Sequence, residues 1–333
     1  MLKTKFFCII FLIFSLNCKI SAEENFFQKN VNLNFEPYFS TRFGVQDEFV
    51  YMKNSLGETK ILSELNWEQK AVFFGGIKAE CGIYGFNLAF KYQEALPLSC
   101  GTVFDSDWRN LELSSWELNS TISAYKTNYS ESECKLERYY NWAVELNYVK
   151  EFKNQIGIKF FAQFDYSYSS FVALGGNYWY GKITSEGFYE PYTDVQETKK
   201  FSGKVLALER INYIAWAGFA LNAKISKFDF TTSFAICPYI HTDSLDSHFI
   251  TRTFFLDRMN SFFTGAKLNF SGKFYFDLKN FISLTIENTT INSLYGKTYS
   301  KDFSETSKYT LSNTASGASF QFVDFTFSFQ HKF

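Results

Sequence analysis

Two short acidic motifs, Asp105-Ser106-Asp107 and Asp246-Ser247-His248, hold the residues of this chain that are best suited to chemistry. In each motif the ionisable residues are two positions apart. In extended backbone that spacing puts both side chains on one face, about 6.5–7 Å apart along the strand. Together the motifs supply three carboxylates and one imidazole, which is enough to hold a water molecule and remove its proton. They can act together only if the fold brings them together.

The choice of base falls among three histidines, His241, His248 and His331. His331 lies near the C-terminus, remote from both motifs, so His248 is the favoured base and His241 the alternative. Histidine is the side chain best suited to accept a proton near neutral pH. Asp246, two positions from His248, would fix the orientation of the imidazole and raise its basicity.

The last segment of the chain, residues 320–333, alternates between apolar and polar residues. One parity carries Val323, Phe325, Phe327, Phe329, His331 and Phe333, and the other carries Asp324, Thr326, Ser328, Gln330 and Lys332. A soluble antiparallel strand alternates in this way too. Together with a secretory signal, a terminal aromatic residue in this register resembles the assembly signal of bacterial outer-membrane barrels.

The first 22 residues are typical of a secretory signal peptide. A short basic start precedes an apolar run over residues 6–16, and residues 20–22 supply the small side chains of a cleavage site. The run is too short for a spanning helix. The alternatives are an N-terminal anchor and a lipoprotein signal that ends at Cys18. We expect one domain over residues 23–333.

The composition favours a membrane protein built of strands. The 333 residues include 42 Phe and 21 Tyr but only four Pro. After the signal, no apolar run approaches the roughly 20 residues that a spanning helix needs. Aromatic residues without such runs suit a lipid-facing barrel, which is apolar outside, polar inside and girdled by aromatics. A formal net charge of −1 gives no electrostatic case for binding nucleic acid.

Alternation recurs in about ten segments, which predicts an all-β fold: an antiparallel transmembrane β-barrel of about ten strands. The segments lie near 31–48, 59–79, 82–96, 137–152, 155–173, 205–222, 226–241, 250–271, 273–292 and 315–333. Short turns fall near 80–82, 153–154, 226–227 and Gly272, and long polar stretches at 46–58, 97–136, 174–204, 241–250 and 293–314. Because such barrels place short turns in the periplasm and long loops outside, both acidic motifs are expected in extracellular loops. We also expect the barrel to project beyond the membrane.

On these motifs the chain resembles the omptins, aspartate–histidine endopeptidases of the bacterial outer membrane. Residues 104–108, Phe-Asp-Ser-Asp-Trp, are similar to the family's Asp-x-Asp-Trp, and residues 246–248 to its Asp-x-His. Residues 48–67 resemble its first strand pair, and residues 168–178 the segment around its third loop. The resemblance implies a monomeric, aspartic-type endopeptidase of the outer membrane that acts on peptides or proteins. Its site would face the exterior, and it would need no cofactor.

The resemblance also implies roles for the two motifs. His248 would be the general base, oriented by Asp246. Asp105 would hold the attacking water opposite His248, and Asp107 would support that arrangement. Because water itself attacks the peptide carbonyl, no covalent intermediate is implied.

Three further residues fall at substrate-binding positions of the family. Glu48 matches an acidic residue that receives the side chain of an Arg or Lys next to the scissile bond, and a carboxylate suits that task physically. Glu48 also lies at an even position of its segment, and the even positions face the barrel interior if the strand runs unbroken. Ser120 falls where the family has a serine near the site. Ser244 stands where the family has a second acidic residue, which bears on the strength of a preference for Arg or Lys.

The sequence departs from the family at a lipid-binding site. Many omptins bind the lipid A phosphates of lipopolysaccharide through outward basic and polar residues. The matching stretch here, residues 164–168, carries Tyr166 and Tyr168, which cannot supply that charge. The sequence therefore does not support a dependence on lipopolysaccharide.

Other interpretations stay open. The chain could be a porin or adhesin with a degenerate site. Carboxylates two positions apart also suit oxygen-ligated cations, so a metal-binding barrel is a third hypothesis. Cys100 and Cys134 fall in one predicted loop, where they could pair in an oxidising compartment or remain free buried thiols.

Overall fold

The computed structural model describes residues 31–112, 126–152, 155–193, 196–277, 280–304 and 306–332. The expected signal peptide therefore lies outside the described residues. The strands are β1 (Val31–Lys53), β2 (Thr59–Ile83), β3 (Phe86–Ala95), β4 (Ser99–Asp107), β5 (Asn128–Glu151), β6 (Ile156–Tyr180), β7 (Lys199–Lys200), β8 (Lys204–Ile225), β9 (Phe228–His248), β10 (Thr253–Ser261), β11 (Gly265–Tyr275), β12 (Asn280–Asp302) and β13 (Thr310–Lys332). Within these ranges no helix is long and apolar enough to cross a membrane.

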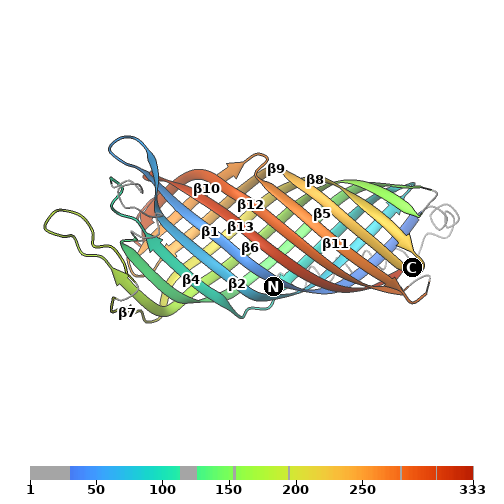
Figure 1. Cartoon of the computed structure of the whole chain (residues 1–333), viewed down its shortest axis with the longest axis horizontal. Helices are drawn as coiled ribbons and strands as arrows, with labels where there is room; N and C mark the ends of the chain where they lie inside the picture. The colour runs from blue at the N-terminus through green and yellow to red at the C-terminus, as the bar shows by residue number, and fades with distance from the viewer. Residues whose placement is uncertain are drawn as a thin grey trace.

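The strands close into a single antiparallel barrel (Figure 1). β1 pairs with both β2 and β13, and β5 pairs with β6, so the ring has no open edge. β3 and β4 share one position in the ring, β10 and β11 share another, and β7 is a two-residue addition beside β6. The barrel therefore has ten strand positions, which confirms the prediction from the alternating segments.

The outer surface of the barrel has an apolar band that ends part-way along the strands. On β13, Phe325, Phe327 and Phe329 point outward and are exposed, whereas the intervening Ser328 is buried. Further along the same outward face stands the polar residue Gln321. This change from apolar to polar marks where the strands leave the lipid.

A belt of aromatic side chains lies at this boundary on neighbouring strands. Trp142 of β5, Tyr166 of β6 and Tyr213 of β8 stand side by side in the register, with ring centroids 5.3–5.4 Å apart. Aromatic belts of this kind sit at the membrane–water interface. The six longest β-strands run 23–25 residues, against the 9–11 or so that a tilted strand needs to cross. The barrel thus projects well beyond the membrane, as predicted.

The strand ends differ from the prediction in the projecting part. β4 spans residues 99–107, within the long loop that was expected there, and β9 continues to His248, so both acidic motifs lie on strands and not in loops. Above the membrane the outward face of a strand meets water, while the inward face carries both charged residues and a buried apolar cluster that includes Leu65, Val103 and Leu206. The alternation that reveals a strand therefore fades there, while its hydrogen-bonded ladder continues.

Two expected turns also lie elsewhere. β11 runs through Gly272 to Tyr275, and β12 begins at Asn280, so the chain reverses between these two residues, whereas residues 262–264 only interrupt the ring position that β10 and β11 share. β2 extends past residues 80–82, and the turn to β3 is Tyr84-Gly85, with φ of 51° and 83°. Positive φ at both positions is the geometry of a tight two-residue hairpin, which glycine favours. The turn expected at 153–154 lies outside the described residues, and the one at 226–227 is confirmed.

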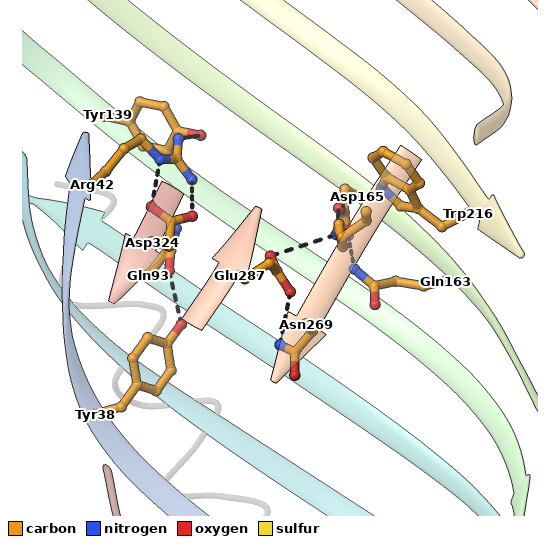
Figure 2. Close-up of polar contacts among 11 residues, drawn as sticks. Tyr38, Arg42, Gln93, Tyr139, Gln163, Asp165, Trp216, Asn269, Glu287 and Asp324 are labelled. Carbon is orange, nitrogen blue, oxygen red and sulfur yellow. Dashed lines mark hydrogen bonds and ion pairs between the residues drawn. The ribbon is translucent and has the colours of Figure 1, made fainter. Parts of the chain in front are cut away.

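The interior of the barrel is filled by a polar network (Figure 2). Arg42 makes a bidentate ion pair with Asp324, at 2.8 and 2.9 Å, and donates a third hydrogen bond to Tyr139. Further round the wall, Lys267 lies 3.2 Å from Asp165. These groups line a polar cavity of about 410 Å³. Pairing of this kind spares each buried charge the cost of lacking a partner, and an apolar cluster that includes Trp216, Phe320 and Phe322 packs beside the cavity.

Candidate active site

The first acidic motif lies at the outer end of β4, held between β2 and β5. Asp105 stands opposite Leu65 of β2, and Asp107 opposite Asn128 of β5. The carboxylate of Asp107 accepts a 2.6 Å hydrogen bond from Asn128 and lies 3.5 Å from Arg109. Burial, and next the charge of Asp107, raise the pKa of Asp105 to about 7. Asp105 can therefore gain or lose a proton near neutral pH.

The second motif lies at the outer end of β9, between β8 and β10. His248 Nε2 is 2.5 Å from Asp246 Oδ2, so the carboxylate fixes the ring and leaves the second ring nitrogen as the proton acceptor. The ring of Phe255 packs edge-on against the imidazole at 5.1 Å. Burial acts to lower the pKa of His248, but the charge and hydrogen bond of Asp246 outweigh it and raise the pKa to about 9.

The two motifs face each other across the outer end of the barrel. On the shorter way round the ring, β5, β6 and β8 separate β4 from β9, so the two strands stand on opposite sides. Each motif affects the other electrostatically: His248 acts to lower the pKa of Asp105, and Asp105 acts to raise that of His248. Figure 1 shows β4, β7 and β10 at the end of the barrel opposite the C-terminus. The structure thus brings together Asp105, Asp107, Asp246 and His248.

Glu48 lies beside this centre and points into the barrel, as its parity predicts. It stands in the same cross-strand row as Asp105, with Leu65 between them. Its carboxylate accepts a 3.1 Å hydrogen bond from Trp67 Nε1. Burial, and next the charge of Asp246, act to raise its pKa, and the charge of Arg210 acts to lower it.

The sequence reasoning missed Arg210, which contacts two of the three predicted substrate-binding residues. Arg210 Nη2 lies 3.3 Å from Glu48 Oε1, and Arg210 Nε donates a 3.0 Å hydrogen bond to Ser244 Oγ. Both Arg210 and Ser244 are fully buried. The available signal was an arginine at an interior position of an alternating segment, where a charge needs a partner.

Asp257 is a second residue that the sequence reasoning missed. It stands opposite Ser244 in the register of β9 and β10, and it is buried. Burial raises its pKa to about 6, while Arg210 acts to lower it.

Three other predicted features have different positions. Ser120 lies outside the described residues. His241, the alternative base, is 3.4 Å from Asp243 on the outward face of β9 and stands apart from the centre. The sulfur atoms of Cys100 and Cys134 are 3.2 Å apart and unbonded, since a disulfide needs about 2.05 Å. Among the residues that the structure describes, no group of three or more His, Cys, Asp or Glu is arranged to hold a metal ion.

Comparison with known proteins identifies the family. The model of the omptin family matches residues 37–333. The crystal structure of the outer membrane protease OmpT from Escherichia coli superimposes with a TM-score of 0.71 at 17% identity, covering 91% of this chain and 97% of that one. The toluene transporter TodX of P. putida (TM-score 0.32, 8% identity, 91% and 90% covered) and Neisserial surface protein A (0.27, 8%, 91% and 97%) match more loosely. No curated protein sequence matches the chain. The chain therefore belongs to the omptin family, as an outer-membrane β-barrel protease whose site faces outward.

Proposed function

We propose that this omptin is an endopeptidase in which water, held between Asp105 and His248, attacks the peptide bond directly. The observation that carries the proposal is the 2.5 Å contact of His248 with Asp246, placed opposite the carboxylates of Asp105 and Asp107. A base fixed by a carboxylate on one side and facing further carboxylates across a cleft suits the deprotonation of water.

The proposed reaction begins with transfer of a proton from the bound water to the free nitrogen of His248. The water oxygen bonds to the carbonyl carbon as the C=O π electrons move onto the carbonyl oxygen. Asp246 stabilises the imidazolium that forms. When the tetrahedral intermediate collapses, the C–N bond breaks and His248 returns its proton to the leaving amine. Asp105, with Asp107 beside it, accepts a hydrogen bond from the second O–H of the water, which keeps its proton, and so aims the lone pair of the water oxygen.

We also propose that this activity does not depend on lipopolysaccharide. The outward face at the membrane boundary carries Tyr140, Trp142, Tyr166, Tyr168 and Tyr213, which stack on one another. These rings suit the membrane–water interface but carry no positive charge for a phosphate group, and the guanidinium of Arg138 beside them lies over the Tyr140 ring at 4.9 Å.

The predicted preference for Arg or Lys next to the scissile bond requires that Glu48 be open to the substrate. In the structure this carboxylate already lies 3.3 Å from the guanidinium of Arg210. The preference thus stays a prediction, and Arg210 is the residue on which it depends.

The test uses protein folded in detergent and a set of internally quenched peptides of varied sequence, with and without a chelator. We expect cleavage that the chelator leaves unchanged and that falls about 10²–10⁴-fold in Asp105→Asn and in His248→Ala. His241→Ala is the matched control, because His241 lies on the outward face of the same strand and should keep full activity. Cleavage of no peptide by folded protein, or equal rates in the two histidine variants, would overturn the proposal.

A further inference from the structure

Arg210 is built into the inner wall of the barrel, beside the acidic motifs, by contacts with three neighbouring residues. Its Nε donates to Ser244 Oγ at 3.0 Å, its Nη2 donates to the carbonyl of Asp47 at 3.3 Å, and the same Nη2 lies 3.3 Å from Glu48 Oε1. The side chain is fully buried. A guanidinium held at this many points loses little freedom in forming each contact, so its position is well defined.

The place that Arg210 occupies is next to the reacting centre. Ser244 precedes Asp246 by two positions on β9, so both side chains point inward on the same strand. Glu48 lies in the cross-strand row of Asp105. The carboxylate that Arg210 neutralises is therefore the one that a substrate side chain beside the scissile bond would meet.

The geometry points to a subsite that carries its own guanidinium: we propose that Arg210 takes the place of a basic substrate side chain at Glu48, so that this omptin selects an uncharged residue there. The inference rests on the proposed endopeptidase function and names its substrate class. A substrate Arg or Lys would either stand against the fixed charge of Arg210 or displace it. Displacement would separate a buried cation that cannot lose its proton from the carboxylate of Glu48, its ion-pair partner.

The remaining charges exclude an acidic side chain as well. Glu48, Asp246 and Asp257 are carboxylates of the same wall, and Arg210 is the cation that Glu48 and Asp257 share. An added Asp or Glu would meet this cluster of like charges in a poorly solvated site, where repulsion is strong. An uncharged side chain meets neither penalty.

The experiment compares peptides that differ only in the residue before the scissile bond: Arg, Lys, Gln, Leu or Glu. For the wild type we expect kcat/KM to be at least tenfold higher with Gln or Leu than with Arg. Arg210→Ala frees Glu48, so the ratio of the Arg to the Gln peptide should rise at least tenfold. Adding Glu48→Gln to Arg210→Ala should abolish that rise. The ratios are measured over a range of pH, because removing Arg210 raises the pKa of Glu48 and so changes the pH at which its carboxylate is charged.

The controls separate charge from folding. Arg258→Ala removes an arginine from the exposed outward face of β10 and should leave the ratios unchanged. Arg210→Gln retains a donor for Ser244 without the charge, and it serves if Arg210→Ala does not fold. A wild type that favours Arg over Gln tenfold, or a ratio unmoved in both Arg210 variants, overturns the inference while the protease function stands. If folded wild type cleaves none of the peptides, the proposed function itself fails.

Discussion

Replacing Asp246 with asparagine should change the pH at which activity appears. In the structure, burial acts to lower the pKa of His248, and the carboxylate of Asp246 outweighs it to give a value of about 9. Without that carboxylate, burial is opposed only by the charges of Asp105 and Glu48, which rank below Asp246. The pKa of His248 should then fall to its ordinary value of about 6.5 or below.

The sign of the effect on rate follows from the form of His248 that acts. The general base is the neutral imidazole, which is populated above the pKa. In the wild type, kcat/KM should therefore rise about tenfold for each pH unit between about pH 7 and 9, more steeply below pH 7 where Asp105 also ionises, and level off near pH 9. In Asp246→Asn the pKa of His248 should fall by about 2.5 pH units, which corresponds to about 3.4 kcal/mol, so the ionisation of Asp105 near pH 7 should then set the start of the plateau. The plateau should also be about 10²–10⁴-fold lower, because the base is weaker and its ring is no longer held.

The measurement is kcat/KM between about pH 5 and 10, with an uncharged residue before the scissile bond so that substrate charge is constant. Asp243→Asn is the matched control, since Asp243 is a carboxylate of the same strand that faces outward beside His241. Its profile should match the wild type. An unchanged midpoint in Asp246→Asn, or a wild-type rate that falls between pH 7 and 9, would refute the reasoning.

Three other predictions concern the barrel and its lipid. Arg42→Ala leaves the buried carboxylate of Asp324 without its bidentate partner, so the free energy of unfolding in urea should fall by about 3–5 kcal/mol; a loss below about 1 kcal/mol would contradict this. Mild oxidation should join Cys100 and Cys134, whose sulfurs already touch, with a mass loss of two hydrogens and two fewer titratable thiols; if both thiols persist, the contact is too constrained to close. Adding lipopolysaccharide to protein refolded without it should change kcat/KM less than twofold, and a tenfold gain would show that the lipid is required.

The barrel could be predicted from the sequence because the two faces of each strand meet different surroundings. Lipid outside and a polar interior force successive side chains to alternate, and a shift by one residue would reverse every one of them. Phe325, Phe327 and Phe329 therefore had to face outward, and they do. The same parity placed Glu48 inside the barrel, where the structure confirms it.

The strand ends could not be predicted in the same way. Beyond the aromatic belt the outward face no longer meets lipid, and the inward face mixes apolar side chains with charged ones, so the segments around Asp105 and His248 lost their alternation and were expected to be loops. Their strand character comes from partners far away in the sequence, such as Leu65 beside Asp105 and Leu206 beside His248. Such pairing depends on the register of the whole ring, which no local pattern contains. The two acidic motifs could still be recognised, because residues two positions apart lie on the same face of a strand wherever that strand ends.

The proposed specificity depends on two residues, Ser244 and Arg210, that make sense only together. The family's second acidic residue is replaced by Ser244, a change that by itself would weaken the attraction for a basic substrate. Arg210 then adds a fixed cation, and the hydroxyl of Ser244 accepts its Nε–H at 3.0 Å. An aspartate at 244 would hold the same guanidinium but restore a negative charge beside Glu48. Serine instead keeps Arg210 in place and lets it neutralise Glu48, which converts a site suited to Arg or Lys into one suited to an uncharged side chain.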